Sequence, residues 1–273
     1  MNNIEKIAYQ GSPGSYSEEL LKKEFQNSQY LSCNSFGELV ENVSANNSYG
    51  LLPVENSIAG TVIEAYEELI DSDLKIFAEY IKKIDHSLIG LPGSNLNQIN
   101  QVISHPQALQ QCSKFIQENN FKISPVFDTA GSLIELEANQ DMSIAAIAGI
   151  HFENNSKFEI LKKNIANHSE NFTRFVLIGN NEPDNNLIKN KYSSVLISDD
   201  KPGSLLKALN IFSDLNINLT KLESRPILGR PWEYKFYIDY ELGEYDIQEN
   251  LVVKIAEVSK EFKILGHYPK ANI

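Results

Sequence analysis

Cysteine and tryptophan are scarce in this sequence. Its 273 residues include two cysteines and one tryptophan. Cys33 and Cys112 lie 112 − 33 = 79 positions apart, in neither a CxxC nor a Cys/His pattern. Two isolated thiols indicate a reducing compartment, and the five histidines have no spacing typical of metal ligands. We therefore expect no metal and no cofactor.

Positive charge and long apolar segments are also missing. The formal net charge is -12 and the pI is about 4.9, which excludes general binding to nucleic acids or to anionic membranes. No cationic stretch followed by an apolar run opens the chain, and no segment is long enough to cross a membrane. We expect a cytoplasmic protein. If its substrate is an anion, positive groups must be concentrated locally.

Arginine occurs at only three positions, Arg174, Arg225 and Arg230, in a chain that otherwise uses lysine. A guanidinium group binds a carboxylate through a rigid two-pronged contact that an ammonium group cannot make. In the segment from Asn171 to Phe175, the alternation of a strand sends Thr173 and Phe175 to one face and Arg174 to the other. This segment is either a half-buried strand with an exposed arginine or part of a binding site.

The first part of the chain alternates short β-rich runs with helical patterns. This order predicts an α/β fold with parallel sheets covered by helices, in which ligands bind where loops leave the C-terminal ends of strands. The expected strands span residues 4–9, 49–54, 101–104, 123–127, 143–148 and 172–179, and the expected helices span residues 15–25, 61–70, 106–116 and 130–138.

A polar, turn-rich segment from Asn180 to Asn186 predicts a linker. We therefore expect one domain over residues 1–180 and a second over residues 190–273. The second domain has expected strands at 192–197, 217–223, 234–240 and 262–268, and expected helices at 202–214 and 247–259. The order βαββαβ is that of a ferredoxin-like fold.

Four polar clusters follow expected strands at points where helices begin, at residues 10–17, 53–57, 104–108 and 128–132. Glycines, hydroxyl and amide side chains, and free backbone N–H groups at helix starts suit a bound anion. Each cluster also fits a turn or a helix cap, with Ser15, Ser104 and Asp128 as candidate caps. A lone histidine such as His105 is more often packed than catalytic, so single clusters leave both interpretations open.

Together the clusters resemble the prephenate dehydratase family. The matching segments, in order along the chain, are Ala8–Gly11, Tyr16-Ser17, Pro53–Ser57, Ser104–Leu109, Gln111-Cys112, Thr129-Ala130, Asn171 and Thr173–Phe175. After the linker, Pro202–Leu206, Asn218–Lys221, Glu223–Pro226, Trp232 and Tyr234 resemble an ACT regulatory domain of the same family. The chain departs from the family pattern at Asp128, where serine is usual, at Gln10, where an apolar residue is common, and at Ser12-Pro13, where Gly-Pro is common.

The resemblance implies a two-lobed catalytic domain, similar to periplasmic binding proteins, that converts prephenate into phenylpyruvate with loss of carbon dioxide and water. It implies that Thr173 is the catalytic proton donor and that Arg174 holds a substrate carboxylate. The other implied substrate-binding residues are Asn56, Ser57, Ser104, His105, Gln107, Thr129, Ala130 and Phe175. Because a carboxylate beside an anionic substrate is unfavourable, Asp128 is expected to point away or to cap a helix.

The resemblance also implies feedback regulation by L-phenylalanine, bound between two ACT domains of a homodimer or homotetramer. The implied effector-binding residues are Gly203, Ser204, Leu205, Leu206, Asn218, Leu219, Thr220, Glu223 and Ser224. Two other functions stay open: an arogenate dehydratase, which acts on the aminated substrate, and a non-catalytic amino-acid sensor. The intact Thr173-Arg174-Phe175 segment argues against the sensor.

Overall fold

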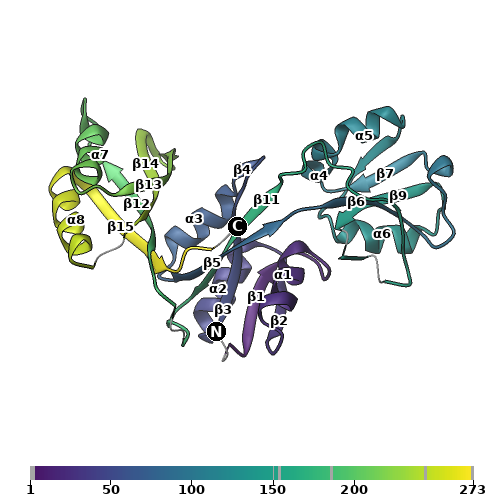
Figure 1. Ribbon diagram of the computed structural model, residues 1–273, viewed down its shortest axis with the longest axis horizontal. Coiled ribbons are helices and arrows are strands. Elements are labelled where there is room, and N and C mark those ends of the chain that lie inside the picture. Colours follow the sequence, from purple (N-terminus) through teal and green to yellow (C-terminus); the bar gives the residue numbers. More distant parts are fainter. Residues whose placement is uncertain (1–3, 150, 153–154, 185–186, 243–244, 272–273) are drawn as a thin grey trace.

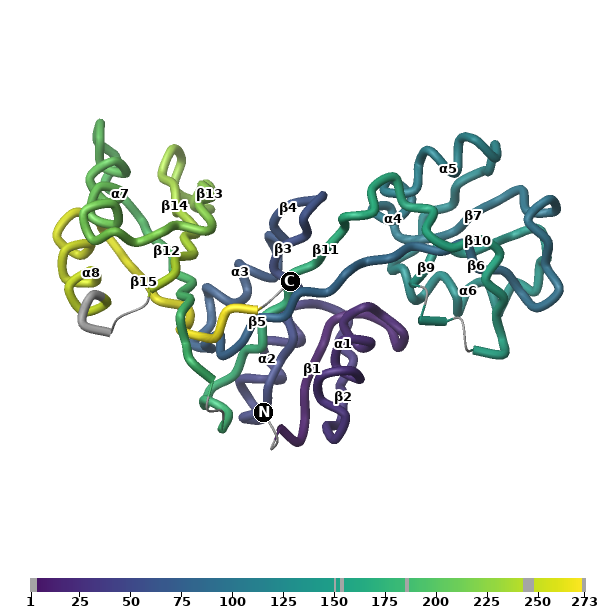
Figure 2. The backbone as a smooth tube through the Cα atoms, in the orientation of Figure 1, coloured from purple at the N-terminus to yellow at the C-terminus, as the bar shows by residue number. Residues whose placement is uncertain are grey.

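The computed structural model describes residues 4–149, 151–152, 155–184, 187–242 and 245–271. Its elements form three parts, which are separate along the long axis in Figure 1. Lobe 1 (residues 6–83 and 172–179) lies in the middle, and lobe 2 (residues 86–162) lies to one side. The C-terminal unit (residues 191–268) lies to the other side. Figure 2 shows that the chain passes from lobe 1 into lobe 2 and returns, so two connections join the lobes.

Lobe 1 is a mixed sheet with helices packed against it. Ser15 and Ser35 cap the first two helices, because each side-chain oxygen accepts a hydrogen bond from a backbone N–H three residues later. The elements of lobe 1 are β1 (Lys6–Gln10), α1 (Tyr16–Glu24), β2 (Gln29–Cys33), α2 (Phe36–Asn46), β3 (Tyr49–Asn56), β4 (Gly60–Thr61), α3 (Ile63–Asp71), β5 (Lys75–Lys83) and β11 (Phe172–Gly179).

Lobe 2 has its own five-stranded sheet, with the strand order β10-β6-β9-β7-β8 within the described residues. Its elements are β6 (His86–Gly90), η1 (Leu96–Gln98), β7 (Gln101–Ser104), α4 (Pro106–Gln111), α5 (Ser113–Glu118), β8 (Lys122–Pro125), α6 (Gly131–Asn139), β9 (Ile144–Gly149) and β10 (Glu159–Lys162). Strands β7 and β9 are buried apolar runs, as expected for strands covered on both faces.

The C-terminal unit has the order βαββαβ, with the elements β12 (Lys191–Ser198), α7 (Ser204–Asp214), β13 (Asn218–Ile227), β14 (Arg230–Glu241), α8 (Tyr245–Val258) and β15 (Ser259–Tyr268). Its strands pair in the order β13-β14-β12-β15, and all of these pairs are antiparallel. This is the strand order of a ferredoxin-like fold, so the expected arrangement is confirmed. The expected division at residues 180–190 stays a prediction.

The sheets of lobe 1 and the C-terminal unit join into one. Gly266 of β15 pairs in parallel with Ile76 of β5, which gives the strand order β13-β14-β12-β15-β5-β11-β3-β1-β2. A side chain at Gly266 would place its Cβ atom 2.4 Å from the carbonyl oxygen of Ile76. Glycine is therefore required here by the close approach of two backbones.

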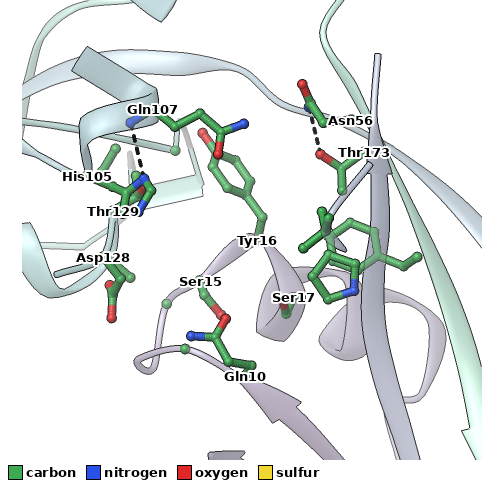
Figure 3. Close-up of a pocket in the computed structure, with 18 of the residues that line it drawn as sticks. Gln10, Ser15, Tyr16, Ser17, Asn56, His105, Gln107, Asp128, Thr129 and Thr173 are labelled. Carbon is green, nitrogen blue, oxygen red and sulfur yellow. Dashed lines mark hydrogen bonds between the residues drawn. The ribbon is translucent and has the colours of Figure 1, made fainter. Parts of the chain in front are cut away.

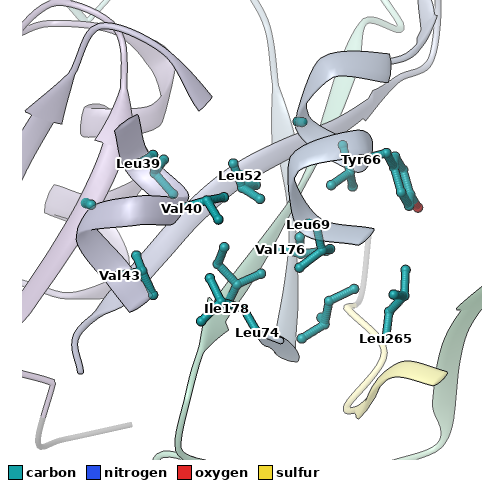
Figure 4. Packing of buried hydrophobic residues seen from close by; sticks show 14 of the residues in the cluster. Leu39, Val40, Val43, Leu52, Tyr66, Leu69, Leu74, Val176, Ile178 and Leu265 are labelled. Carbon is teal, nitrogen blue, oxygen red and sulfur yellow. The ribbon is translucent and has the colours of Figure 1, made fainter. Parts of the chain in front are cut away.

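One hydrophobic core also spans these two parts. Buried residues of lobe 1, among them Leu52 and Leu69, pack in the same cluster as Tyr237, Leu265 and Tyr268 of the C-terminal unit. Figure 4 shows Leu265 at the edge of a cluster that also contains side chains of α2, α3, β3 and β11. A shared core of this kind couples the placement of the two parts, because interiors are close-packed.

The expected elements are found with some changes. The helix expected at 106–116 is interrupted at Cys112, the strand expected at 123–127 ends at Pro125, and the helix expected from Pro202 begins at Ser204. Parallel pairing holds for β2-β1-β3 and β8-β7-β9, whereas β11 is antiparallel to β3 and β5. The sequence patterns do not predict β2, α2, β5, β6 or β10. Among the described helices, none is long and apolar enough to span a membrane.

Candidate functional site

A cavity of about 420 Å³ lies between lobe 1 and lobe 2. Figure 3 shows side chains entering it from α1, β3 and β11 on one side and from the starts of α4 and α6 on the other. Seven of the implied catalytic and substrate-binding residues line it: Asn56, His105, Gln107, Thr129, Ala130, Thr173 and Phe175. The segments that carry the family resemblance, although far apart in sequence, thus meet in one cleft.

Thr173 is held at the wall of this cavity by Asn56. The two residues are direct partners in the register of β11 and β3. The amide nitrogen of Asn56 donates a hydrogen bond to Thr173 Oγ1 over 3.0 Å, and the backbone N–H groups of Ile58 and Ala59 donate to the amide oxygen of Asn56. The amide therefore has a fixed orientation. Because Thr173 Oγ1 accepts this bond, the hydroxyl proton of Thr173 is free to be donated into the cleft.

A chain of hydrogen bonds continues from Asn56 behind the cavity wall. Asn56 also donates to Asn171 Oδ1 over 2.7 Å, and Asn171 donates to Gln111 Oε1 over 3.1 Å. His86 Nε2 lies 2.8 Å from the same Gln111 oxygen, which assigns the proton to Nε2, because a carbonyl oxygen only accepts. Tyr16 ends the chain, with its hydroxyl 3.1 Å from His86 Nδ1.

The titratable groups of this chain are held neutral. Burial lowers the pKa of His86 below its usual value, since His86 is 2% exposed. Burial, assisted by the negative charge of Glu19, raises the pKa of Tyr16 well above its usual value. The Tyr16 hydroxyl also lies 2.8 Å from the backbone oxygen of Asp85, so its single proton is shared between this oxygen and His86 Nδ1. Neutral donors and acceptors at fixed positions can orient a polar substrate without reorganising during a reaction.

The cavity holds no concentrated positive charge. Its described lining residues include Glu64 and Asp128 but no lysine or arginine, so the expected local cluster of cationic side chains is not found in it. Helices α1 and α6 both begin at its wall, through Ser15–Ser17 and Thr129-Ala130. The positive ends of these helix dipoles favour an anion without any cationic side chain.

Asp128 joins the two lobes across the cavity. Ser12, in the loop before α1, donates its hydroxyl proton to Asp128 Oδ2 over 2.6 Å, and the other oxygen of Asp128 accepts from the N–H of Gly131 at the start of α6. Asp128 thus binds the first N–H group of α6, although Ala130 occupies the N-cap position, and the expectation that Asp128 points away is wrong because Asp128 lines the cavity. Two of the places where the chain departs from the family pattern, Ser12-Pro13 and Asp128, are therefore in contact with each other.

A second contact between the lobes involves His151. Its Nε2 atom lies 2.8 Å from the carbonyl oxygen of Gly14, and its Nδ1 atom lies 2.8 Å from a carboxylate oxygen of Glu19. Burial acts to raise the pKa of Glu19, but hydrogen bonds from His151 and Lys82 outweigh it and lower this pKa to about 2. Glu19 is therefore ionised at neutral pH.

Ser57 and Ser104 do not line the cavity. Ser57 accepts a hydrogen bond from the N–H of Phe172, which fixes the start of β11. Ser104 is fully buried and donates to the backbone oxygen of Ile147 over 2.6 Å. His105, rather than Ser104, caps α4, because its Nδ1 atom accepts from the N–H of Gln107. Ser57 and Ser104 therefore support the site from behind.

Arg174 also lies away from the cavity, so its expected contact with a substrate carboxylate is not found. The alternation along β11 holds, with Thr173 and Phe175 lining the cavity and Arg174 on the opposite face. There the guanidinium group lies 2.6 Å from Asp239 of β14 and 3.2 Å from Glu55 of β3. The two-pronged contact expected for a scarce arginine is not found either, because a single nitrogen, Nη1, contacts both carboxylates.

The implied effector residues are spread over the C-terminal unit. Gly203 precedes α7 with φ +79°, a conformation that favours glycine, and Ser204 is buried. Leu206, Asn218, Thr220 and Ser224 are exposed, whereas Leu205 and Leu219 pack against the core of the unit. Glu223 accepts a hydrogen bond from Thr61 of β4 and lies 3.3 Å from Lys221. The exposed residues therefore present donors and acceptors outward.

Sequence reasoning missed several residues of the hydrogen-bond chain as site residues. Tyr16, Gln111 and Asn171 lie inside matching segments, so their polar side chains at helix starts and strand ends could have identified them. His86 gives no such signal, since it is a lone histidine at the start of an apolar strand. Within the described residues, no group of three or more His, Cys, Asp or Glu side chains is arranged to hold a metal ion.

Comparisons with known proteins agree with this geometry. A model of the prephenate dehydratase family matches residues 7–183. The prephenate dehydratase of Methanocaldococcus jannaschii is 36% identical, over 96% of this chain and 97% of the relative. Arogenate dehydratase 1 of Petunia hybrida is 32% identical, over 97% of this chain and 66% of the relative.

Solved structures share the whole fold. The prephenate dehydratase of Arthrobacter aurescens in complex with L-Phe superimposes with a TM-score of 0.87 at 24% identity, covering 97% of this chain and 90% of that one. A protein described as a novel type of quorum quenching acylase superimposes with a TM-score of 0.86 at 27% identity, covering 97% of this chain and 98% of that one.

Proposed function

Because this chain belongs to the prephenate dehydratase family, we propose that it converts prephenate into phenylpyruvate in phenylalanine biosynthesis, with release of carbon dioxide and water. The observation that carries the proposal is the Thr173 hydroxyl, which faces the cleft with its oxygen already hydrogen-bonded by Asn56. A free hydroxyl proton at a fixed position is what expulsion of a ring hydroxyl group requires.

Thr173 donates its proton to the hydroxyl group of the substrate ring as the carbon–oxygen bond breaks, so that water leaves instead of hydroxide. The carbon–carboxylate bond breaks, its electron pair enters the ring, and carbon dioxide leaves as the ring becomes aromatic. The overall reaction consumes one proton, which returns to Thr173 from solvent. The N–H of Asn56 stabilises the negative charge that develops on Thr173 Oγ1.

The absence of lysine and arginine from the described cavity lining suits this reaction. A cationic clamp on the leaving carboxylate would stabilise the charged ground state more than the transition state, in which that charge disperses. Neutral donors and the starts of α1 and α6 bind the dianion without this cost. Gln107, His105 and Thr129 are in position to contribute such donors from lobe 2.

The C-terminal unit acts as an ACT regulatory domain that binds L-phenylalanine in a dimer or tetramer of the chain. Its ferredoxin-like strand order and the exposed Asn218, Thr220 and Ser224 on β13 support this role. The Arthrobacter aurescens relative with the same fold is described as a complex with L-Phe. The enzyme is expected to act in the cytoplasm, which stays a prediction.

Arogenate is the second candidate substrate, and Asp128 is the observation that favours it. Arogenate carries an ammonium group where prephenate carries a keto group, and a carboxylate in the cavity wall attracts an ammonium group. The Petunia relative is named as an arogenate dehydratase. Competition between the two substrates for the purified enzyme distinguishes these candidates, because the preferred substrate has the higher kcat/KM.

Acyl hydrolysis, the activity named for one structural relative, has less support in the site. An activated serine or cysteine nucleophile needs a base within hydrogen-bond reach. In the described part of the cleft, His86 contacts Gln111 and Tyr16, His105 contacts the N–H of Gln107, and His151 contacts the backbone oxygen of Gly14 and the carboxylate of Glu19. None of these partners is a serine or cysteine side chain.

The test of the proposed function is direct. Purified protein is mixed with prephenate, and phenylpyruvate is measured by its absorbance in alkali. Formation of phenylpyruvate by the wild-type protein, and its loss in Thr173→Ala, supports the proposal. Thr173→Ala is compared with wild type by thermal unfolding, so that loss of the fold is distinguished from loss of the proton donor.

A further inference from the structure

Two neighbouring residue pairs occupy opposite faces of strands β3 and β11. Thr173 is the register partner of Asn56, and Arg174 is the register partner of Glu55. The first pair is hydrogen-bonded on the cavity face, whereas the second pair is joined on the other face, where Arg174 lies 3.2 Å from Glu55. Any shift of Arg174 relative to Glu55 therefore shifts Thr173 relative to Asn56, because the pairs are adjacent along the same two strands.

The pairing of these strands is irregular just after Arg174. Thr173 and Arg174 oppose Asn56 and Glu55, but Phe175 opposes Pro53, so the register changes between Arg174 and Phe175. A bulge of this kind bends the strand and sets the direction of the side chains beside it. The other edge of β11 pairs with β5 without interruption from Phe172 to Leu177, so the irregular edge toward β3 is the one at which side-chain contacts add to the placement of Thr173.

The shortest contact of Arg174 comes from the C-terminal unit, although Glu55, Glu79 and Tyr66 of lobe 1 also lie within 3.4 Å of its guanidinium group. Its guanidinium lies 2.6 Å from Asp239 of β14, and the two side chains are 9% and 2% exposed. Ser193 of β12 donates to the other oxygen of Asp239 over 2.6 Å. Tyr66 of α3 lies 3.3 Å from the guanidinium group and stacks on Tyr237 of β14. One oxygen of Asp239 is thus held by Ser193 of the neighbouring strand β12, and the other is held by Arg174 of β11.

The surroundings form a charge cluster of six residues, namely Glu55, Glu79, Arg174, Lys191, Lys221 and Asp239. Lys191 pairs with Glu79 over 2.8 Å, and Lys221 pairs with Glu55 over 2.9 Å. Within these six residues three positive and three negative groups balance, and Lys221 links them to a further pair, Glu223 and Arg225. Glu55, Glu79 and Arg174 belong to lobe 1, whereas Lys191, Lys221 and Asp239 belong to the C-terminal unit. Removal of Arg174 and Asp239 together leaves two complete ion pairs.

We propose that Arg174 is a positioning residue for Thr173 and that its contact with Asp239 makes the alignment of Thr173 depend on the placement of the C-terminal unit. This inference rests on the proposed role of Thr173 as proton donor. Arg174 does not touch the substrate. It holds β11 against β3 from the face opposite the cavity, and the C-terminal unit holds Arg174.

The test compares three variants in steady-state turnover of prephenate. Asp239→Asn removes the negative charge beside Arg174 but keeps the shape of the side chain. Arg174→Lys keeps the positive charge but replaces the planar guanidinium group, which contacts several partners at once, by a single ammonium group. Each is expected to lower kcat about 10- to 100-fold with KM nearly unchanged, since a small misplacement of a catalytic group acts on the chemical step. The control is Lys235→Met, which breaks the contact between Lys235 of β14 and Glu67 of α3 without touching β3 or β11.

A double variant separates positioning from stability. Arg174→Met combined with Asp239→Leu replaces a buried ion pair by apolar groups, which often preserves folding where a single removal does not. We expect the double variant to regain the thermal stability lost in Asp239→Asn but to keep the low kcat. Where Asp239→Asn does not fold, the double variant and Arg174→Lys decide the outcome.

Recovery of wild-type kcat in the folded double variant would overturn the inference, because it would show that the pair serves stability alone. An unchanged kcat in Asp239→Asn, or a loss in Lys235→Met as large as in Asp239→Asn, would overturn it as well. Failure of the proposed function looks different. In that case wild-type protein does not form phenylpyruvate, or Thr173→Ala is as active as wild type.

Discussion

Asn56 Nδ2 lies 3.0 Å from Thr173 Oγ1, and the Asn56 oxygen accepts from two backbone N–H groups. This geometry fixes the direction of both side chains. A threonine hydroxyl is a weak acid, so its use as a donor depends on stabilisation of its oxygen as the proton leaves. A directed N–H group at hydrogen-bond distance supplies that stabilisation before the substrate arrives.

Thr173→Ala is expected to lower kcat by about 10²- to 10⁴-fold, the usual contribution of a general acid. KM should change little, because the lost interaction develops in the transition state. Thr173→Ser, which keeps a hydroxyl group, is the matched control and should retain most of the activity. Steady-state kinetics with prephenate measures both. An unchanged kcat in Thr173→Ala would remove Thr173 from the chemistry.

Asn56→Asp tests the donor itself. The variant has nearly the same shape but presents an acceptor, and a negative charge, to Thr173 Oγ1. We expect kcat to decrease about 10²-fold or more, comparable to the loss of one oxyanion-hole donor. Ser57→Ala, one residue later and outside the cavity, should cost far less. Equal losses in the two variants would indicate that the segment acts only as scaffold.

Asp128→Ser restores the residue that is usual in the family and removes a carboxylate from the cavity wall. This carboxylate should repel the dianion prephenate and attract the ammonium group of arogenate. Its removal should therefore raise the ratio of kcat/KM for prephenate to kcat/KM for arogenate about 2- to 5-fold, which corresponds to about 0.5–1 kcal/mol for a partly exposed charge pair. Competition between the two substrates measures this ratio. A lower ratio would mean that Asp128 favours prephenate.

His86 makes the stability of the fold depend on pH. Burial lowers its pKa in the folded protein, so just below about pH 6.5 the unfolded chain binds a proton that the folded chain does not. The stability from neutral His86 is therefore complete above about pH 6.5 and decreases as pH falls through the folded-state pKa. Urea unfolding of wild type and His86→Gln at about pH 5 and about pH 8 isolates this effect.

The variant should lose less stability than wild type between the higher and the lower pH. The other histidines are unchanged in the comparison, so their titration cancels. A wild-type protein that is no less stable at the lower pH, relative to the variant, would mean that His86 is charged in the folded state.

Glu223→Gln tests the link between β13 and the catalytic lobe. The carboxylate of Glu223 accepts from Thr61, whose strand β4 pairs with Glu55 and Asn56 of β3. We expect Glu223→Gln to weaken inhibition by phenylalanine about 5-fold or more, within the usual range of coupling free energies, with kcat in the absence of phenylalanine nearly unchanged. Inhibition that remains as strong as in wild type would place the coupling elsewhere.

The sequence predicts local features well because they depend on neighbouring residues. The cap at Ser15, the alternation of Thr173 and Arg174 along β11, and the βαββαβ order of the C-terminal unit all follow from short-range patterns. The cleft residues could be gathered only through the family resemblance. No local pattern states that Asn56 and Thr173, 117 positions apart, are hydrogen-bonded.

The partners of Arg174 could not be predicted from the sequence. Asp239 lies on a strand of the C-terminal unit, and the contact exists because β15 pairs with β5 and joins two sheets into one. Lys191 and Lys221 likewise look like ordinary surface lysines until this joining buries them. Long-range pairing decides which charged residues become buried, and no short-range pattern in the sequence indicates that pairing.

The rate of phenylpyruvate formation from prephenate, measured side by side for the wild type, Thr173→Ser and Thr173→Ala, tests the central claim most directly. The account predicts rapid turnover by the wild type, substantial turnover by Thr173→Ser, and a kcat lower by about 10²-fold or more for a folded Thr173→Ala. Phenylpyruvate formation at the wild-type rate by Thr173→Ala, or none by the wild-type protein, would contradict it.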